Sequence, residues 1–227
     1  ITVTTPEDVQ SKVYHPPSNV GPFILEGSKP GAAAASLWLS HRTIPPSREG
    51  YGEIMRASLL AARELYERLV HWEQSCRANH EETGYCFIPI TAPPPDTNMV
   101  CFVVKAKDSN SLPLMNRLSE AVYKRFTIQA ELGERDYSYS QPFFLSRTRF
   151  HLPQYSAHSV EDLLARAGVD ATEYPAHGIF VIRATVMNPY ILLSSETGHR
   201  QEFLADLVER LAAETGRLRR LGLWVLA

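Results

Sequence analysis

The run Gly178-Ile-Phe-Val-Ile-Arg-Ala-Thr-Val-Met187 constrains the fold more than any other part of the sequence. Its β-branched and aromatic residues predict a strand over 178–187. A second run, Asn98–Lys105, is apolar enough for a strand that is buried on both faces. Further elements are expected as strands at 85–90 and 143–150 and as helices at 111–126 and about 200–218. Together these elements predict a small α+β unit that begins near residue 82.

Helical periodicity dominates residues 50–78, where one apolar stripe predicts the longest helix of the chain. The stripe consists of Ile54, Ala57, Ala61, Leu65 and Leu69. The charged residues of this segment are expected to form solvated faces. Another helix is predicted at 159–167. Ser159, with Asp162 in the capping-box position, is expected to begin it, and Gly168 to end it.

Phe23–Trp38 joins a turn rich in glycine and proline to an alanine-rich segment, which predicts a tight turn that opens a helix ending near His41. Gly27 allows the backbone to approach another group closely, and Ser28 is the expected N-cap. The N–H groups at such a helix start suit an anion, for example a phosphate. An ordinary capped and buried helix is the alternative interpretation.

The bulk composition argues against several classes of protein. The 227 residues carry a net charge of −2, which argues against a surface that binds polyanions. The sequence has neither a long apolar run nor a signal-peptide pattern, so we expect no membrane span. The three cysteines, Cys76, Cys86 and Cys101, lack metal-ligand spacing and favour a reduced, cytoplasmic setting. The start at Ile1 suggests that a longer polypeptide lies upstream.

Several ordered motifs carry a specific likeness to a known family. These motifs are Gly21–Arg42, the Ile44-Pro-Pro and Gly50-Tyr-Gly segments, Asn98–Lys105, Phe143–Phe150 and Val181–Tyr190. In this order they resemble bacterial tyrosine decarboxylases, which belong to the group II pyridoxal-phosphate-dependent amino-acid decarboxylases. The resemblance covers nearly the whole chain.

The resemblance implies an α/β protein with the fold of the type I pyridoxal-phosphate-dependent transferases. Residues 1–81 would form the end of the large domain, with a mobile loop, the Gly-Ser-Lys-Pro-Gly turn and an interdomain helix. Residues 82–227 would form the α+β C-terminal small domain. Relatives carry their cofactor lysine in an Asp-Pro-His-Lys-like motif, which this sequence lacks. The Schiff-base lysine is therefore expected in an upstream part of the same enzyme.

The resemblance also assigns roles to the turn at Gly27 and Ser28. In relatives the matching turn reaches the phosphate of the pyridoxal 5'-phosphate of the neighbouring subunit, which implies a homodimer with shared active sites. Lys29 stands where relatives commonly have arginine, and arginine cannot bind the cofactor covalently. We therefore expect Lys29 to place a positive charge near the phosphate or an interface, with an exposed turn lysine as the alternative.

Arg183 and Tyr14 are the candidate catalytic residues. A buried arginine in an apolar strand requires an anionic partner. For Arg183 this partner is the substrate carboxylate or a catalytic-loop residue, as the resemblance implies, or a core carboxylate in a structural salt bridge. Tyr14 is the only tyrosine in the loop at 1–22, which matches a segment that brings a proton-donating tyrosine in relatives. Its surroundings depart from the family pattern, and His15 is an adjacent alternative.

The function implied is that of a carboxy-lyase, which releases carbon dioxide from an aromatic L-amino acid such as tyrosine, or from glutamate. Relatives that lack the usual tyrosine can instead release an aldehyde by oxidative deamination, so an aldehyde synthase is one alternative. A non-catalytic subunit or pseudoenzyme of the same fold is another. A small-molecule substrate is expected, with no nucleic acid and no membrane as partner.

Overall fold

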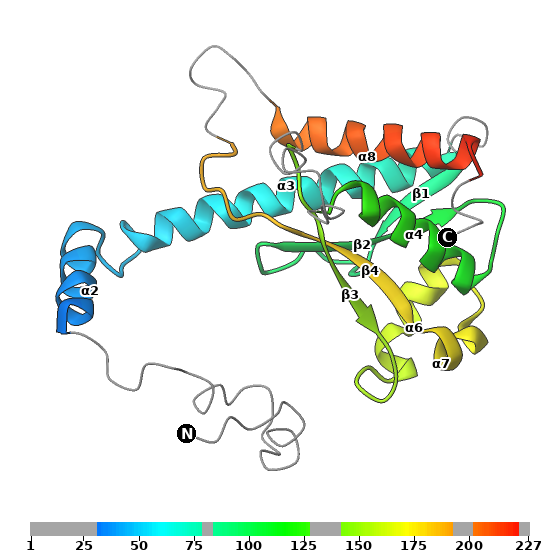
Figure 1. Ribbon diagram of the computed structural model, residues 1–227, viewed down its shortest axis with the longest axis horizontal. Coiled ribbons are helices and arrows are strands. Elements are labelled where there is room, and N and C mark those ends of the chain that lie inside the picture. The colour runs from blue at the N-terminus through cyan, green and yellow to red at the C-terminus, as the bar shows by residue number, and fades with distance from the viewer. Residues whose placement is uncertain (1–30, 79–83, 128–141, 193–201, 223–227) are drawn as a thin grey trace, which may run out of the picture. The chain divides into compact units, whose positions relative to one another are not determined.

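The computed structural model describes residues 31–78, 84–127, 142–192 and 202–222 (Figure 1). The chain divides into two compact units, Ile1–Tyr51 and Gly52–Ala227. In the first unit the structure describes helix α2 (Gly31–Thr43), which confirms the helix predicted after the Gly-Ser-Lys-Pro turn. The domain boundary predicted at 81/82 stays a prediction.

One four-stranded sheet with the order β1-β2-β4-β3 forms the centre of the second unit. Its strands are β1 (Tyr85–Pro89), β2 (Met99–Ala106), β3 (Ser146–Phe150) and β4 (Ile179–Thr185). Each neighbouring pair is antiparallel. All four predicted strands are therefore confirmed, and the mixture of helices with an antiparallel sheet confirms the α+β unit.

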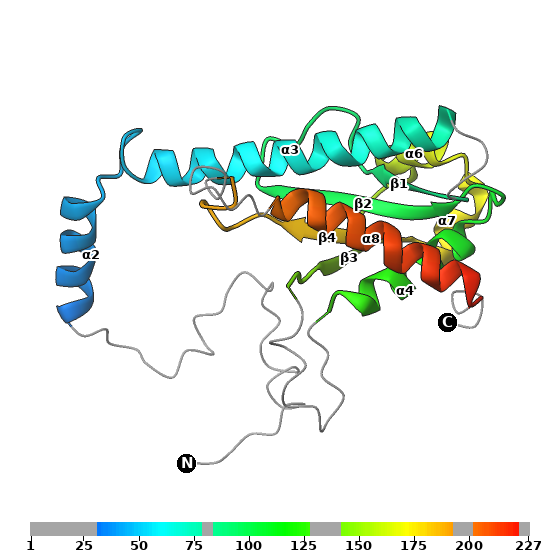
Figure 2. The same ribbon diagram turned by 90° about the horizontal axis from the view of Figure 1, so that it is seen from above.

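Three long helices build the larger core on one face of the sheet (Figures 1 and 2). They are α3 (Tyr51–Ala78), α4 (Leu112–Arg125) and α8 (Phe203–Arg220). In the predicted apolar stripe of α3, Ala61 and Leu69 are fully buried, whereas Ile54 is 38% exposed. None of the helices in the described ranges has the length and apolar character needed to cross a bilayer.

Helix α4 lies where the pairing between the two central strands ends. The ladder between β2 and β4 runs only as far as the pair Phe102–Ile182. Just beyond it, the buried hydroxyl of Ser119 accepts a hydrogen bond from the Val104 N–H at 2.9 Å and donates to the Val104 carbonyl at 3.3 Å. A side chain of the helix thus satisfies backbone groups of β2 that the ladder leaves unpaired.

Asn116 likewise satisfies unpaired backbone groups at the start of β4. Its Nδ2 donates to the Gly178 carbonyl at 2.9 Å, and its Oδ1 accepts from the Phe180 N–H at 2.8 Å. Asn116 is only 8% exposed, so these bonds are shielded from water. Helix α4 therefore joins the start of β4 to β2 through two buried polar side chains.

Shorter helices cover the other face of the sheet over part of its length. These are α6 (Ala157–Ala167), the 3₁₀ turn η2 (Ala171–Glu173) and α7 (Tyr174–His177). They pack with Ile88, Val103, Ile179 and Val181 in a second core cluster. Tyr174 closes this cluster at 1% exposure.

The ends of α6 correct one prediction and confirm another. Ser156, not Ser159, is the N-cap, and its Oγ accepts from the Ser159 N–H at 3.2 Å. Asp162 therefore does not complete a capping box; its carboxylate instead accepts from Arg166 Nε at 2.8 Å. Gly168 ends the helix in the left-handed conformation with φ 59°, as predicted.

Replacing the amide of Asn116 tests its structural role. Asn116→Ala leaves the buried N–H of Phe180 and carbonyl of Gly178 without partners, so we expect a loss of about 2–4 kcal/mol in the free energy of unfolding. The matched control is Asn188→Ala, which removes an exposed side-chain bond to the Tyr190 N–H and should cost less than about 1 kcal/mol. Urea denaturation followed by circular dichroism measures both. Equal losses in the two variants would contradict the role given to Asn116.

Candidate functional site

The predicted site residues fall into two groups. Tyr14, Gly27, Ser28 and Lys29 lie outside the described residues, and their roles stay predictions. Arg183 lies within them, near the end of β4. The described site is therefore built from Arg183 and the residues around it.

Strand pairing sets the immediate neighbours of Arg183. In the antiparallel register it lies opposite Cys101 of β2 on one side and Ser146 of β3 on the other. Its Nε donates to Ser146 Oγ at 2.8 Å, and that hydroxyl donates to the Arg183 carbonyl at 3.1 Å. The hydroxyl fixes the Nε end of the guanidinium but supplies no negative charge to balance it.

This arrangement differs from the sequence expectation for Arg183. The side chain is half-buried rather than buried. In the described ranges no carboxylate forms an ion pair with it, and its two Nη groups have no hydrogen-bond acceptor. The structural salt bridge with a core carboxylate, which the sequence left open for Arg183, is therefore not formed within the described residues. The outer nitrogens stay available to an anion from elsewhere.

The sheet face around Arg183 is open. Side chains alternate along a strand, so Arg183 shares its face with Ile179 and Val181. Those two residues are fully buried beneath α6 and α7, whereas this cover does not extend to the end of the sheet at Met99, which is 39% exposed. We call this region the open sheet patch; it consists of Met99, Cys101, Ser146, Arg183 and Thr185.

Cys101 reports on the electrostatics of the open sheet patch. Burial raises the pKa of its half-buried thiol, and the neighbouring Arg183 guanidinium acts in the opposite direction. Desolvation therefore outweighs the nearby positive charge. The thiol is not activated as a nucleophile, and Arg183 is the group in this patch that can attract an anion.

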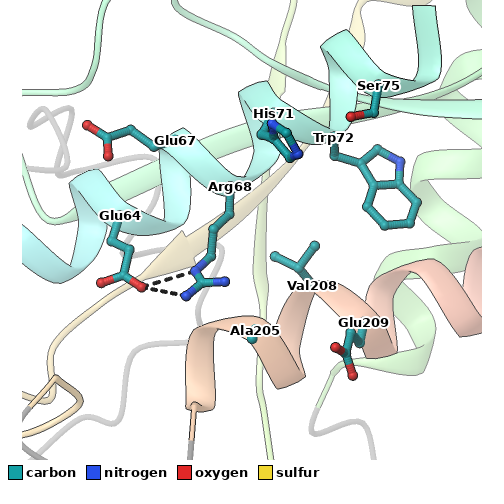
Figure 3. A pocket seen from close by; sticks show the side chains of 9 residues that line it. All are labelled: Glu64, Glu67, Arg68, His71, Trp72, Ser75, Ala205, Val208 and Glu209. Carbon is teal, nitrogen blue, oxygen red and sulfur yellow. Dashed lines mark hydrogen bonds and ion pairs between the residues drawn. The ribbon is translucent and has the colours of Figure 1, made fainter. Parts of the chain in front are cut away.

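A groove between α3 and α8 is a second candidate (Figure 3). It encloses about 620 Å³ and is lined by Glu64, Glu67, Arg68, His71, Trp72, Ser75, Ala205, Val208 and Glu209. Glu64 and Arg68 form an ion pair at 2.8 Å on its wall. The sequence did not indicate this groove, since its two walls come from segments far apart in the chain. The helices that form this groove cover the face of the sheet opposite to Arg183, so the two candidates are separate surfaces.

Helix α2 follows the predicted anion-binding turn, which itself lies outside the described residues. It has no acidic residue in its first turn and no buried residue, so it differs from the buried helix of the alternative interpretation. Leu37, Trp38 and Leu39 are 58–65% exposed. The guanidinium of Arg42 lies 5.5 Å from the Trp38 ring centroid. Across the described ranges, no group of three histidine, cysteine or acidic side chains is placed to hold a metal ion.

The charge of Arg183 can be measured through the Cys101 thiol. In Arg183→Gln the positive charge that lowers the pKa of Cys101 is lost, so its pKa rises further and its thiolate fraction at a fixed pH falls. We expect alkylation of Cys101 by iodoacetamide near pH 8 to slow by about threefold. Arg183→Lys keeps the charge and should stay closer to the wild-type rate. Peptide-resolved mass spectrometry measures the rates, and faster alkylation in Arg183→Gln than in Arg183→Lys would contradict the assignment.

Known proteins match this chain over most of its length. The family model for the C-terminal part of tyrosine decarboxylase matches residues 61–209. An L-tyrosine decarboxylase of Levilactobacillus brevis is 33% identical over 177 residues, which make up 77% of this chain and 26% of that protein. An L-tyrosine decarboxylase of Enterococcus faecium is 32% identical over 184 residues, or 81% of this chain and 28% of that protein. The chain thus spans about a quarter of the length of these relatives.

The family match contains the entire four-stranded sheet and the open sheet patch. It also agrees with the family to which the ordered motifs of the sequence point, so that resemblance is confirmed. The chain therefore belongs to the tyrosine decarboxylase family, as a C-terminal portion of such a protein.

Proposed function

We propose that this chain is part of a pyridoxal-phosphate-dependent decarboxylase that releases carbon dioxide from an aromatic L-amino acid. Tyrosine is the first candidate substrate and glutamate the second. The observation that carries the proposal is the family match over residues 61–209. The relatives named above are L-tyrosine decarboxylases, which favours tyrosine.

The cofactor, when bound, would supply the electron sink for the charge that remains when carbon dioxide departs. Gly27 and Ser28 would hold its phosphate with backbone N–H groups and a hydroxyl, and Lys29 would add a positive charge. The adjoining helix fits this role, because its first turn has no acidic residue that would repel a dianion.

Arg183 is proposed to orient an anion at the open sheet patch. A guanidinium binds a carboxylate through two parallel N–H donors, and the Nη groups of Arg183 have no acceptor in the described ranges. Ser146 holds the Nε side, which limits rotation of the guanidinium. The anion is the substrate carboxylate or a residue of the catalytic loop.

Proton delivery to the α-carbon is assigned to Tyr14, with His15 as the alternative. The sequence around Tyr14 and His15 differs from the family pattern for the loop that donates this proton. The aldehyde-forming oxidative deamination is therefore the second candidate reaction. Protonation of the carbon gives an amine, whereas reaction with oxygen gives an aldehyde and ammonia.

A homodimer with shared active sites is proposed, together with an upstream part that carries the Schiff-base lysine. Helix α2 supports an assembly because Leu37, Trp38 and Leu39 are all largely exposed along one turn. Adjacent exposed apolar residues of this size are typical of a surface that another protein surface covers. We assign that cover to the partner subunit, since the turn before α2 is proposed to reach the partner's cofactor.

Product analysis tests the proposed reaction. The full-length protein is incubated with pyridoxal 5'-phosphate and L-tyrosine, and in parallel with L-glutamate and other aromatic L-amino acids. We expect carbon dioxide and the corresponding amine in equal amounts. An aldehyde with ammonia would support the second candidate reaction. No turnover by a cofactor-loaded protein would point to the non-catalytic alternative.

Borohydride reduction separates the role of this chain from that of the upstream part. Reduction of the cofactor-loaded, full-length protein should fix the cofactor to a lysine upstream of Ile1. Peptide mapping identifies the labelled lysine. Specific labelling of Lys29 would contradict its assignment as a charge near the phosphate.

Substitution of Arg183 tests its contact with an anion. Arg183→Lys keeps the charge but loses the forked geometry, so we expect kcat/KM to fall by about tenfold or more. The matched control is Arg149→Lys on the neighbouring strand, whose guanidinium lies over the Phe180 ring on the opposite face of the sheet. Steady-state kinetics measures both variants. Unchanged KM and kcat in Arg183→Lys would rule out the proposed contact.

A further inference from the structure

Two cysteine thiols meet at the junction of α3 and β1. Cys76 lies in the last turns of α3 and is 5% exposed, and Cys86 lies on β1 and is 9% exposed. Both belong to the core cluster beneath α6 and are thiols rather than halves of a disulfide. Their side chains are joined by a hydrogen bond. The fold therefore brings together two of the three cysteines in the sequence.

These thiols border a pocket that cations surround. The pocket encloses about 380 Å³, and its lining includes Cys76 and Cys86 together with Arg77, Lys105, Lys107 and Arg166. Arg77 and Arg166 form ion pairs with Glu73 and Asp162. Such a pocket favours the entry of an anionic molecule toward the thiols.

Among the cations of this pocket, Lys105 is the one that pairs with Cys86 across the sheet. It lies on β2 directly opposite Cys86 in the sheet register. It is half-buried, and the described ranges provide no carboxylate that forms an ion pair with it. Lys105 lines the pocket together with the two thiols, so its ammonium group can attract an anion to the space beside them.

The hydrogen bond makes the two thiols unequal. It raises the pKa of Cys86, and burial acts in the same direction. Cys76 is therefore assigned the first attack on an incoming disulfide, and Cys86, whose thiol is the harder one to deprotonate, the second. A thiolate that faces a second thiol is the arrangement in which an exchange reaction can be completed within the protein.

We propose that Cys76 and Cys86 form a reversible disulfide by exchange with a small anionic disulfide that enters this pocket. The Cys76 thiolate attacks one sulfur of the incoming disulfide, whose S–S bond breaks and releases one thiolate. The Cys86 thiolate then attacks the sulfur of Cys76 and releases the second half. The two cysteines are oxidised, the incoming disulfide is reduced to two thiols, and the two protons lost by the protein pass to them. The new bond fastens the end of α3 to the edge of the sheet.

The test uses the fully reduced, full-length protein with glutathione disulfide as the probe. Peptide mapping after quenching with iodoacetamide should find a Cys76–Cys86 cross-link that dithiothreitol reverses. Cys101→Ser is the matched control and should form the cross-link as the wild type does. Cys76→Ser and Cys86→Ser should form none. Absence of the cross-link in the wild type, a stable glutathione adduct in its place, or a cross-link through Cys101 would overturn the proposal.

A second measurement tests the charge of the pocket. In Lys105→Gln the rate of cross-linking by glutathione disulfide should fall by about threefold to tenfold, while the rate with cystamine, a cationic disulfide, should not fall. Lys124→Gln, which removes an exposed lysine of α4 outside the pocket, should leave both rates unchanged. Equal effects of Lys105→Gln on the two probes would overturn the role of the pocket in selecting anions.

Discussion

The end of the β2–β4 ladder is the constraint on which the described fold depends. Two antiparallel strands in the centre of a sheet separate after the pair Phe102–Ile182, and their backbone groups beyond that point need other partners. Helix α4 supplies these partners with Ser119 for β2 and Asn116 for β4. The same helix can thereby contribute to both core clusters, because it lies where the sheet opens.

This connection also determines what the open sheet patch presents. Since successive side chains of a strand point to opposite faces, a slip of one residue in β4 would bury Arg183 and expose Ile182. Asn116 prevents such a slip by binding backbone groups on both sides of Ile179. The position of Arg183 beside Ser146 is therefore a consequence of polar contacts at the other end of the same strand.

The sequence alone predicted those parts of the fold that local patterns control. The apolar run of β4, the stripe on α3 and the glycine at the end of α6 all identify elements through residues a few positions apart. The N-cap of α6 was misplaced because Ser156 and Ser159 are both suitable caps, and the choice depends on how the preceding chain enters the helix. The hydroxyl partner of Arg183 could not be predicted, since Ser146 comes from a separate strand. The Cys76–Cys86 contact was missed for the same reason, because spacing along the chain does not indicate which helix end meets which strand.

Arg166 has a consequence for how copies of this protein can associate. Its Nη1 and Nη2 donate to the carbonyls of Pro89 and Ile90 at 2.9 and 2.8 Å, at the outer edge of the sheet. Pro89 has no N–H to offer, and its carbonyl is already taken. An extended strand from another molecule would find neither a donor nor a free acceptor at this position, so this end of β1 resists pairing with a further strand. The proposed contact between subunits would therefore have to use a surface other than this end of the sheet edge.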